Sequence, residues 1–315
     1  MKKILLTGVA GFIGSKIAES LLKQGHSITG IDNLKTGYLK NIPEGVDFVL
    51  GDCADASIYE SKPLRGVLFD TIIHFSGQSS GEISFDDPIQ DLSDNCISTL
   101  NLLQFAQQSS CKNFIFASSM SVYGDSEMSF VDETHATQPL SMYAVGKLAS
   151  EHYLRIFQCY GISSVSLRLF NTYGPGQNMD NDRQGMISIY LAQALEKESI
   201  QVKGSADRFR DFVYIDDVTR VVSHFIDYGF VGAEIYNVCT SSKTTVSTAI
   251  NSIKKSVGKN NISVEYTEGT PGDQFGIVGC NKKLKRETSK NKKFLIEPDF
   301  IDIHTGIERF VESLG

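Results

Sequence analysis

Short apolar runs alternate with segments whose apolar side chains recur every three or four positions over the first 170 residues. The first run, Lys3–Thr7, has the composition of a strand that is buried on both faces of a parallel sheet. A glycine-rich turn follows it, and then a segment whose apolar residues Ile17, Leu21 and Leu22 share one helix face. Further strands are expected at 27–31, 47–50, 69–75 and 113–117, and helices at 90–108 and 141–158. This alternation predicts a doubly wound parallel α/β sheet.

The turn after the first strand carries three glycines, Gly8, Gly11 and Gly14, spaced G-x-x-G-x-x-G. Glycines between a strand and a helix allow a tight turn, close approach of a pyrophosphate and close helix–strand packing. The following helix N-terminus offers unpaired N–H groups and a positive dipole end to phosphates. The cluster therefore predicts a dinucleotide site, although an ordinary strand-to-helix turn has the same pattern.

Asp32 favours the dinucleotide interpretation. It ends the second predicted strand, about 20 residues after the glycines, where a carboxylate accepts both hydroxyls of an adenosine ribose. A carboxylate would repel the 2′-phosphate of NADP. The predicted cofactor is therefore NAD.

Other polar residues follow strands at the same predicted edge of the sheet. Asp52 could accept from an adenine amino group or cap a helix. The small residues of Ser76–Ser80 would let the backbone lie against the cofactor, and His74 is interpreted as a packed strand-end residue. Asn95 could be a buried anchor for a catalytic loop or an exposed polar residue, and the sequence alone leaves both open.

The chemical centre is predicted on the helix that begins near Ser141. Tyr143 and Lys147 are four residues apart and therefore neighbours on one helix face. An ammonium beside a phenol favours the phenolate, so we expect a lowered Tyr143 pKa and a tyrosine that acts as a general base. Ser119, at the end of the fifth strand, could bridge a substrate hydroxyl to Tyr143.

Composition agrees with an enzyme of small molecules. The 315 residues suit one large domain or two closely joined ones, and the net charge of −7 argues against a nucleic-acid or membrane surface. No apolar run is long enough to span a bilayer, and no export signal is read. The six cysteines lack the close pairs of metal sites, which predicts reduced thiols, no metal and a cytoplasmic location.

Three later blocks add a family resemblance: Leu167–Gln177, Arg208–Asp217 and Tyr236–Val238. With the elements above, they make the chain similar over nearly its full length to the extended short-chain dehydrogenases/reductases of the nucleotide-sugar epimerase/dehydratase group, in particular the UDP-glucose 4-epimerase type. The resemblance implies a Rossmann-type NAD-binding domain at 1–170 and a smaller, mainly substrate-binding α/β domain at 171–315, with segments near 210–240 returning to the first. It also implies a homodimer through the helices at 90–108 and 141–158, and a UDP-sugar as substrate.

The same resemblance implies roles for individual residues. The implied catalytic residues are Ser119, Tyr143 and Lys147. The implied cofactor-binding residues are Gly8, Gly11, Phe12, Ile13, Gly14, Asp32, Asn33, Lys35, Thr36, Gly37, Asp52, Cys53, Phe75, Ser76, Gly77, Gln78, Asn95, Tyr143, Lys147 and Phe170. The implied substrate-binding residues are Ser119, Asn171, Arg210 and Asp273.

The chain departs from the motifs of the group at two places, one that bears on the reaction and one that bears on substrate binding. The 4,6-dehydratases of the group carry an Asp-Glu pair after the Ser/Thr, whereas this chain has Met120 and Ser121, which cannot do that acid–base work. Epimerisation, at C4 through a 4-keto intermediate, is the leading expectation. A 4-keto reductase, a one-way dehydrogenase and a non-catalytic NAD-binding regulator are the alternatives. Thr270 stands where 4-epimerases carry a diphosphate-binding Arg, so the cation that replaces it is open.

Overall fold

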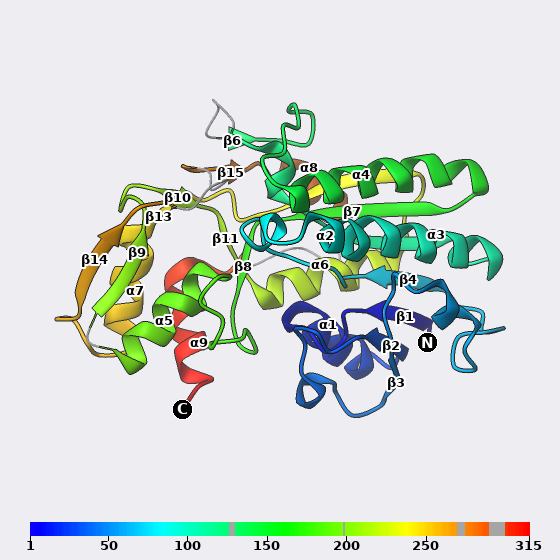
Figure 1. Ribbon diagram of the computed structural model, residues 1–315, viewed down its shortest axis with the longest axis horizontal. Coiled ribbons are helices and arrows are strands. Elements are labelled where there is room, and N and C mark those ends of the chain that lie inside the picture. Colours follow the sequence, from blue (N-terminus) through cyan, green and yellow to red (C-terminus); the bar gives the residue numbers. More distant parts are fainter. Residues whose placement is uncertain (126–129, 198, 270–274, 290–299) are drawn as a thin grey trace.

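The computed structural model describes residues 1–125, 130–197, 199–269, 275–289 and 300–315. Its centre is a seven-stranded parallel sheet with the strand order β12-β7-β5-β4-β1-β2-β3 (Figure 1). The strands are β1 (Lys3–Thr7), β2 (Ser27–Asp32), β3 (Val46–Leu50), β4 (Thr71–His74), β5 (Asn113–Ser119), β7 (Ser163–Leu169) and β12 (Ala233–Val238). The predicted Rossmann-type sheet is therefore confirmed.

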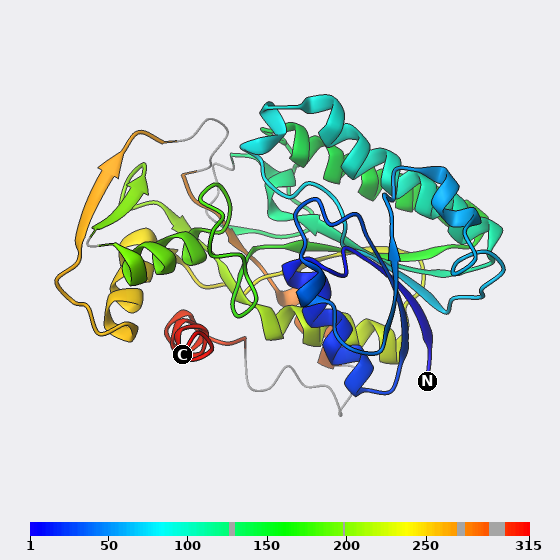
Figure 2. The same cartoon turned by 60° about the horizontal axis from the view of Figure 1, so that its bottom comes forward.

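Both faces of this sheet are covered, which explains the continuous apolar runs. Ile4 and Leu6 of β1 pack into one hydrophobic cluster, while Leu5 between them packs into another. Helices α1 (Phe12–Lys23) and α6 (Ile215–Tyr228) cover one face (Figures 1 and 2). The other face is covered by α2 (Pro88–Leu92), α3 (Ser98–Gln108) and α4 (Met142–Phe157).

The predicted helix at 90–108 is continuous but not uniform. Helix α2 passes through a π-helical segment, Ser93–Ile97, into α3. This inserted turn contains Asn95. Segments of this kind are rare and often mark functional sites.

A second group of elements lies beside the sheet at the left of Figure 1 and has a hydrophobic cluster of its own. Its elements are α5 (Met186–Glu196), α7 (Val246–Ser256), α9 (Ile303–Glu312), β9 (Ser199–Lys203) and β14 (Ser263–Thr267). The remaining strands and helix are short: β6 (Phe130–Val131), β8 (Asn171–Tyr173), β10 (Phe209–Arg210), β11 (Phe212–Tyr214), β13 (Thr244–Thr245), β15 (Val278–Gly279) and α8 (Lys282–Ser289). Across the described ranges, no helix has both the length and the apolar character needed to cross a membrane.

Candidate active site

The topology brings the predicted site residues to one edge of the sheet. Strands β1, β2 and β3 follow one another in one direction, whereas β4 lies on the opposite side of β1. Their register aligns Thr7 with both Ile31 and His74, so the loops after these strands start side by side. Such a reversal of strand order is where open α/β sheets bind ligands.

The glycine turn after β1 requires glycine for steric reasons. Gly8 has φ +75°, and a Cβ there would lie 2.7 Å from the backbone of Phe75 and Ser76 in the neighbouring loop. A Cβ on Gly14 would lie 2.0 Å from the carbonyl oxygen of Gly8. Helix α1 then begins with neither a capping side chain nor an acidic residue in its first turn. Its N–H groups and positive end are suited to a pyrophosphate.

Asp32 is buried, and its carboxylate is held in place by the backbone. Oδ2 accepts from the Ala10 N–H at 3.0 Å and Oδ1 from the Leu34 N–H at 2.8 Å. A carboxylate accepts more than two hydrogen bonds, so capacity remains for a ribose. The donor set around β1 and β2 therefore fits the adenosine and pyrophosphate of NAD, with Asn33, Lys35, Thr36 and Gly37 in the loop that follows.

Asp52 does not cap a helix. Its Oδ1 accepts from the Ala54 N–H at 2.8 Å and its Oδ2 from Asn33 Nδ2 at 3.1 Å, while Asp55 caps the next helical turn. Asp52 is therefore a turn residue that joins the loops after β2 and β3. The adjacent Cys53 is buried, and this burial raises the pKa of its thiol to about 11.

The loop after β4 brings Phe75–Gln78 against the glycine turn and the π segment. His74 is fully buried, with Nδ1 2.8 Å from Thr7 Oγ1 and Nε2 3.1 Å from Thr99 Oγ1. Burial holds the His74 pKa well below its usual range, so the ring is neutral. The interpretation of His74 as a packed strand-end residue is confirmed.

Helix α4 presents Tyr143 and Lys147 together, as their spacing predicted. Ser141 caps the helix by accepting from the Ala144 N–H at 3.2 Å. Both site residues are buried, and Lys147 Nζ lies 5.7 Å from the centre of the Tyr143 ring. A phenol and an ammonium on one buried helix face can exchange protons with a bound hydroxyl.

The predicted lowering of the Tyr143 pKa is wrong for the protein's own groups. Burial raises this pKa to about 12, partly offset by the side-chain hydrogen bond with Ser119. Burial also lowers the Lys147 pKa to about 8. Near neutral pH, the protein's own groups therefore leave Tyr143 a phenol and Lys147 mainly an ammonium.

Ser119 ends β5 at the same edge of the sheet. Its hydroxyl accepts from the Ser121 N–H at 3.1 Å and interacts with the Tyr143 phenol. The expected Ser119–Tyr143 contact is present. Ser121, one of the residues in place of the dehydratase acids, contributes only an N–H and a hydroxyl here.

Asn95 is buried, which decides between its two interpretations. Its Nδ2 donates to Asp91 Oδ1 at 3.2 Å, and its buried Oδ1, beside Gly77, has no hydrogen-bond partner among the described residues. Asp91 also accepts from Gln78 Nε2 at 2.9 Å. Asp91 was missed in the sequence, although its position four residues before Asn95 on a predicted helix was a usable signal.

The expected substrate residues lie where β7 and β10 end. Phe170 is buried, and the Asn171 backbone N–H donates to the Asp211 carbonyl at 3.1 Å. The buried Asn171 Oδ1 has no partner within the part of the chain that the structure describes. Arg210 is buried, and its Nη1 donates to the carbonyls of Phe209 at 2.8 Å and Phe275 at 3.2 Å. Asp273 and Thr270 lie outside the described residues.

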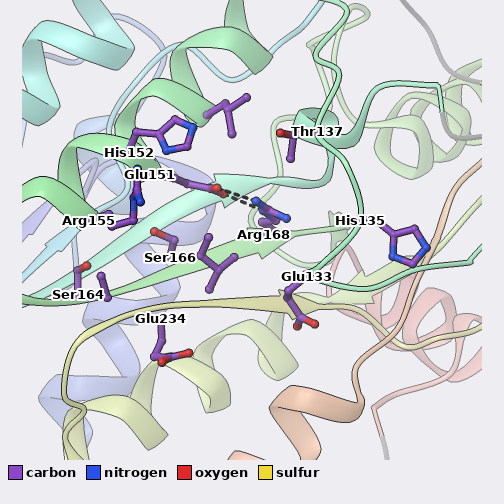
Figure 3. A pocket seen from close by; sticks show the side chains of 13 residues that line it. Glu133, His135, Thr137, Glu151, His152, Arg155, Ser164, Ser166, Arg168 and Glu234 are labelled. Carbon is purple, nitrogen blue, oxygen red and sulfur yellow. Dashed lines mark hydrogen bonds and ion pairs between the residues drawn. The ribbon is translucent and has the colours of Figure 1, made fainter.

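A separate cavity of about 360 Å³ is lined by residues of α4, β7 and β12 (Figure 3). A buried ion pair borders it: Arg168 Nε and Nη2 donate to Glu151 Oε1 at 2.9 Å and Oε2 at 2.7 Å. Ser118 donates to the same carboxylate at 2.5 Å. This pair, which sequence reasoning missed, links α4 to β5 and β7. Glu151 lies four residues after Lys147, as Lys147 does after Tyr143, and this spacing was the sequence signal that could have identified Glu151.

Metal chemistry has no candidate centre in the described part of the chain. No three His, Cys, Asp or Glu side chains there are grouped so that they could hold a metal ion.

Comparison with known proteins places this geometry among known enzymes. The model of the "NAD dependent epimerase/dehydratase family" matches residues 4–239. A protein of Methanocaldococcus jannaschii named as a putative UDP-glucose 4-epimerase is 31% identical over 98% of this chain and 97% of its own.

Two solved structures agree closely with the fold. The UDP-glucose 4-epimerase of Thermus thermophilus, in complex with NAD, has a TM-score of 0.89 at 31% identity, over 99% of this chain and 98% of its own. The UDP-glucose 4-epimerase of Thermotoga maritima, with UDP-glucose, has a TM-score of 0.91 at 28% identity and the same coverage.

Proposed function

The chain belongs to the NAD dependent epimerase/dehydratase family, and from that premise we propose that it epimerises a nucleotide-activated sugar at C4. The observation that carries the proposal is the buried pair of Tyr143 and Lys147 beside Ser119, at the edge of the sheet where Asp32 also lies. Met120 and Ser121 stand where a 4,6-dehydratase needs acids. Full-length similarity to UDP-glucose 4-epimerases supports the same activity.

NAD is the cofactor. We propose that Gly8 to Gly14 and the α1 N-terminus hold its pyrophosphate, Asp32 its adenosine ribose, and the loops after β2, β3 and β4 its remaining edges. Asn95, Phe170, Tyr143 and Lys147 would lie about the nicotinamide half. When bound, NAD supplies reversible two-electron oxidation of the sugar at C4.

The chain's own residues then handle the proton. Tyr143, as its phenolate, takes the proton of the C4 hydroxyl, and Ser119 holds that hydroxyl and relays the proton to the phenolate. Lys147 keeps positive charge beside Tyr143 and binds the nicotinamide ribose. The proton returns from Tyr143 to the C4 oxygen in the second half of the cycle, so the phenolate is regenerated.

The expected substrate is a UDP-sugar. The Thermotoga maritima structure with UDP-glucose supports this choice. In this chain Asn171 and Arg210 would hold the diphosphate, since forked guanidinium donors suit it, and Asp273 stays a predicted substrate-binding residue. We place the boundary between an NAD-binding domain and a mainly substrate-binding domain near residue 170, with β12 returning to the first sheet.

A homodimer is also proposed. Exposed apolar side chains on α2 and α4 support it, among them Ile89 and Ile156, which are 76% and 56% exposed. Val145→Lys on α4 should turn a dimer into a monomer in light scattering, and a wild-type monomer would exclude the proposal. A cytoplasmic location stays a prediction.

The test of the function supplies UDP-, GDP-, CDP- and dTDP-hexoses to purified enzyme with no added cofactor. The C4 epimer of one of them should appear and reach equilibrium from either side. Turnover only with added NAD(P)H would indicate a reductase, and steady NADH accumulation a one-way dehydrogenase. NAD binding without turnover of any sugar nucleotide would indicate the regulator.

A further inference from the structure

Asp91 lies at the junction of three segments that carry proposed site residues. It is 2% exposed, near the end of α2, and faces α4. Its Oδ1 accepts from Gln78 of the loop after β4 and from Asn95 of the π segment, at 2.9 and 3.2 Å. A Cβ placed on Gly146, next to Lys147, would lie 3.8 Å from Asp91 Oδ2. A buried carboxylate with this arrangement reaches Gln78, Asn95 and the Lys147 region at once.

We propose that Asp91 is a positioning residue of the epimerase. Its carboxylate keeps Lys147 an ammonium in a desolvated site. It also fixes the Asn95 amide so that Oδ1 faces Gly77 in the loop after β4. This inference rests on the proposed function, because Lys147 and Asn95 need to be positioned if they act in epimerisation. The electrostatic part can be tested without turnover.

The need for such a residue follows from burial. Lys147 is 5% exposed, and desolvation disfavours its charged form. Asp91 is the leading group that opposes this loss and raises the Lys147 pKa. The site must keep this ammonium if its charge is to act on Tyr143.

Other ionisable groups around Asp91 have different roles. Asp94, one turn further along, is held by Gln90 Nε2 at 2.7 Å and by Lys35 Nζ at 3.5 Å. Burial raises the Asp91 pKa to about 6, and the charge of Asp94 adds to this rise. Burial raises the pKa of the Cys96 thiol and of the Tyr143 phenol, and the charge of Asp91 adds to both shifts. The positive charge of Lys147 acts on Asp91 in the opposite sense and lowers its pKa. Asp91 is therefore ionised at and above neutral pH, where Lys147 begins to lose its proton.

The asymmetric hydrogen bonding of Asn95 supports the positioning part. Its amide nitrogen is fixed by Asp91, which turns the buried, unpartnered Oδ1 toward Gly77. An unpaired buried acceptor costs free energy in the protein alone. The arrangement is explained if a bound donor uses Oδ1.

The test compares Asp91→Asn with Asp94→Asn. Asparagine at 91 still offers an oxygen to Gln78 and Asn95 but removes the charge, whereas the change at 94 removes a charge that is not aimed at Lys147. Lys147 is titrated in NAD-loaded protein by NMR of ε-¹³C-lysine, with Lys147→Ala to assign the signal. The alkaline limb of kcat is measured in parallel.

Asp91→Asn should move the Lys147 titration and the alkaline limb to lower pH by roughly one unit or more, and Asp94→Asn should move neither. Asp91→Glu, which keeps the charge, should restore the titration and covers the case in which Asp91→Asn folds poorly. An unchanged Lys147 titration in Asp91→Asn would overturn the proposal even if kcat falls. A shifted titration in a protein that epimerises nothing would keep the electrostatic role and reject the proposed function.

Discussion

Gly146 and Asn95 approach each other so closely that a Cβ on Gly146 would lie 3.1 Å from the Asn95 Cβ. The same Cβ would lie 3.5 Å from Cys96 Sγ. Glycine in mid-helix costs about 1 kcal/mol relative to alanine. The close contact with Asn95 explains why residue 146 is a glycine, since the missing Cβ lets α4 pack against the π segment.

Gly146→Ala should therefore gain helix propensity but push Asn95 and Lys147 apart by a few tenths of an ångström. We expect a melting temperature close to that of the wild type and a clearly lower kcat. The control is Gly269→Ala, at an exposed position whose Cβ would meet, among the described residues, Gly204 alone at 4.0 Å; it should change neither value. A fully active Gly146→Ala enzyme would show that this packing does not position the site.

Asp32 should determine the choice between NAD and NADP. Asp32→Asn keeps an acceptor for the Ala10 or Leu34 N–H but loses the charge. We expect weaker NAD binding, since hydrogen bonds to a charged group contribute about 1.5–3 kcal/mol, and a smaller preference over NADP. Calorimetric titration with both dinucleotides measures the two changes. Tighter NADP than NAD binding by the wild type would reject the assignment.

Tyr143→Phe should abolish the proton transfer while keeping the ring. Loss of a general base lowers kcat by about 10²–10⁴-fold, and KM and NAD binding should change little. Tyr123→Phe is the matched control, because that buried phenol donates to Asn237 Oδ1 at 2.7 Å, away from the proposed chemistry. It should lose stability and keep kcat. Equal loss of kcat in both variants would argue for a packing effect.

The ion pair of Glu151 and Arg168 should contribute strongly to the stability of the contact between α4 and the strands β5 and β7. Glu151→Ala leaves a buried guanidinium without its carboxylate, which typically costs about 3–5 kcal/mol. The urea midpoint should fall strongly. Glu19→Ala, which breaks an exposed i,i+4 pair with Lys23, should change stability by less than about 1 kcal/mol. Similar midpoints for the two variants would contradict this ranking.

Much of the fold could be predicted because the parallel strands are buried on both faces. The run Lys3–Thr7 matches β1, and the second run ends at Asp32 as β2 does. The π segment at Ser93–Ile97 could not be predicted, since its apolar spacing does not distinguish it from an α-helix. Nor could the raised Tyr143 pKa, which depends on burial by distant segments rather than on the neighbouring Lys147.

The site was predictable where local spacing sets geometry and not where tertiary contact does. Tyr143 and Lys147 share a face because they are four residues apart. Asp91 acts on Lys147 because α2 packs against α4 at Gly146, a contact across more than 50 positions. Pattern and motif therefore identified the proposed reacting groups but not the residues that we propose position them.

The central claim is reversible oxidation at C4 of a nucleotide sugar inside one closed cycle. Its most direct test uses the sugar nucleotide that the panel identifies, deuterated at C4, with enzyme in ordinary water and no added cofactor. The C4 epimer should form with its deuterium still at C4. Loss of that deuterium to solvent, or an epimer inverted at another carbon, would contradict it.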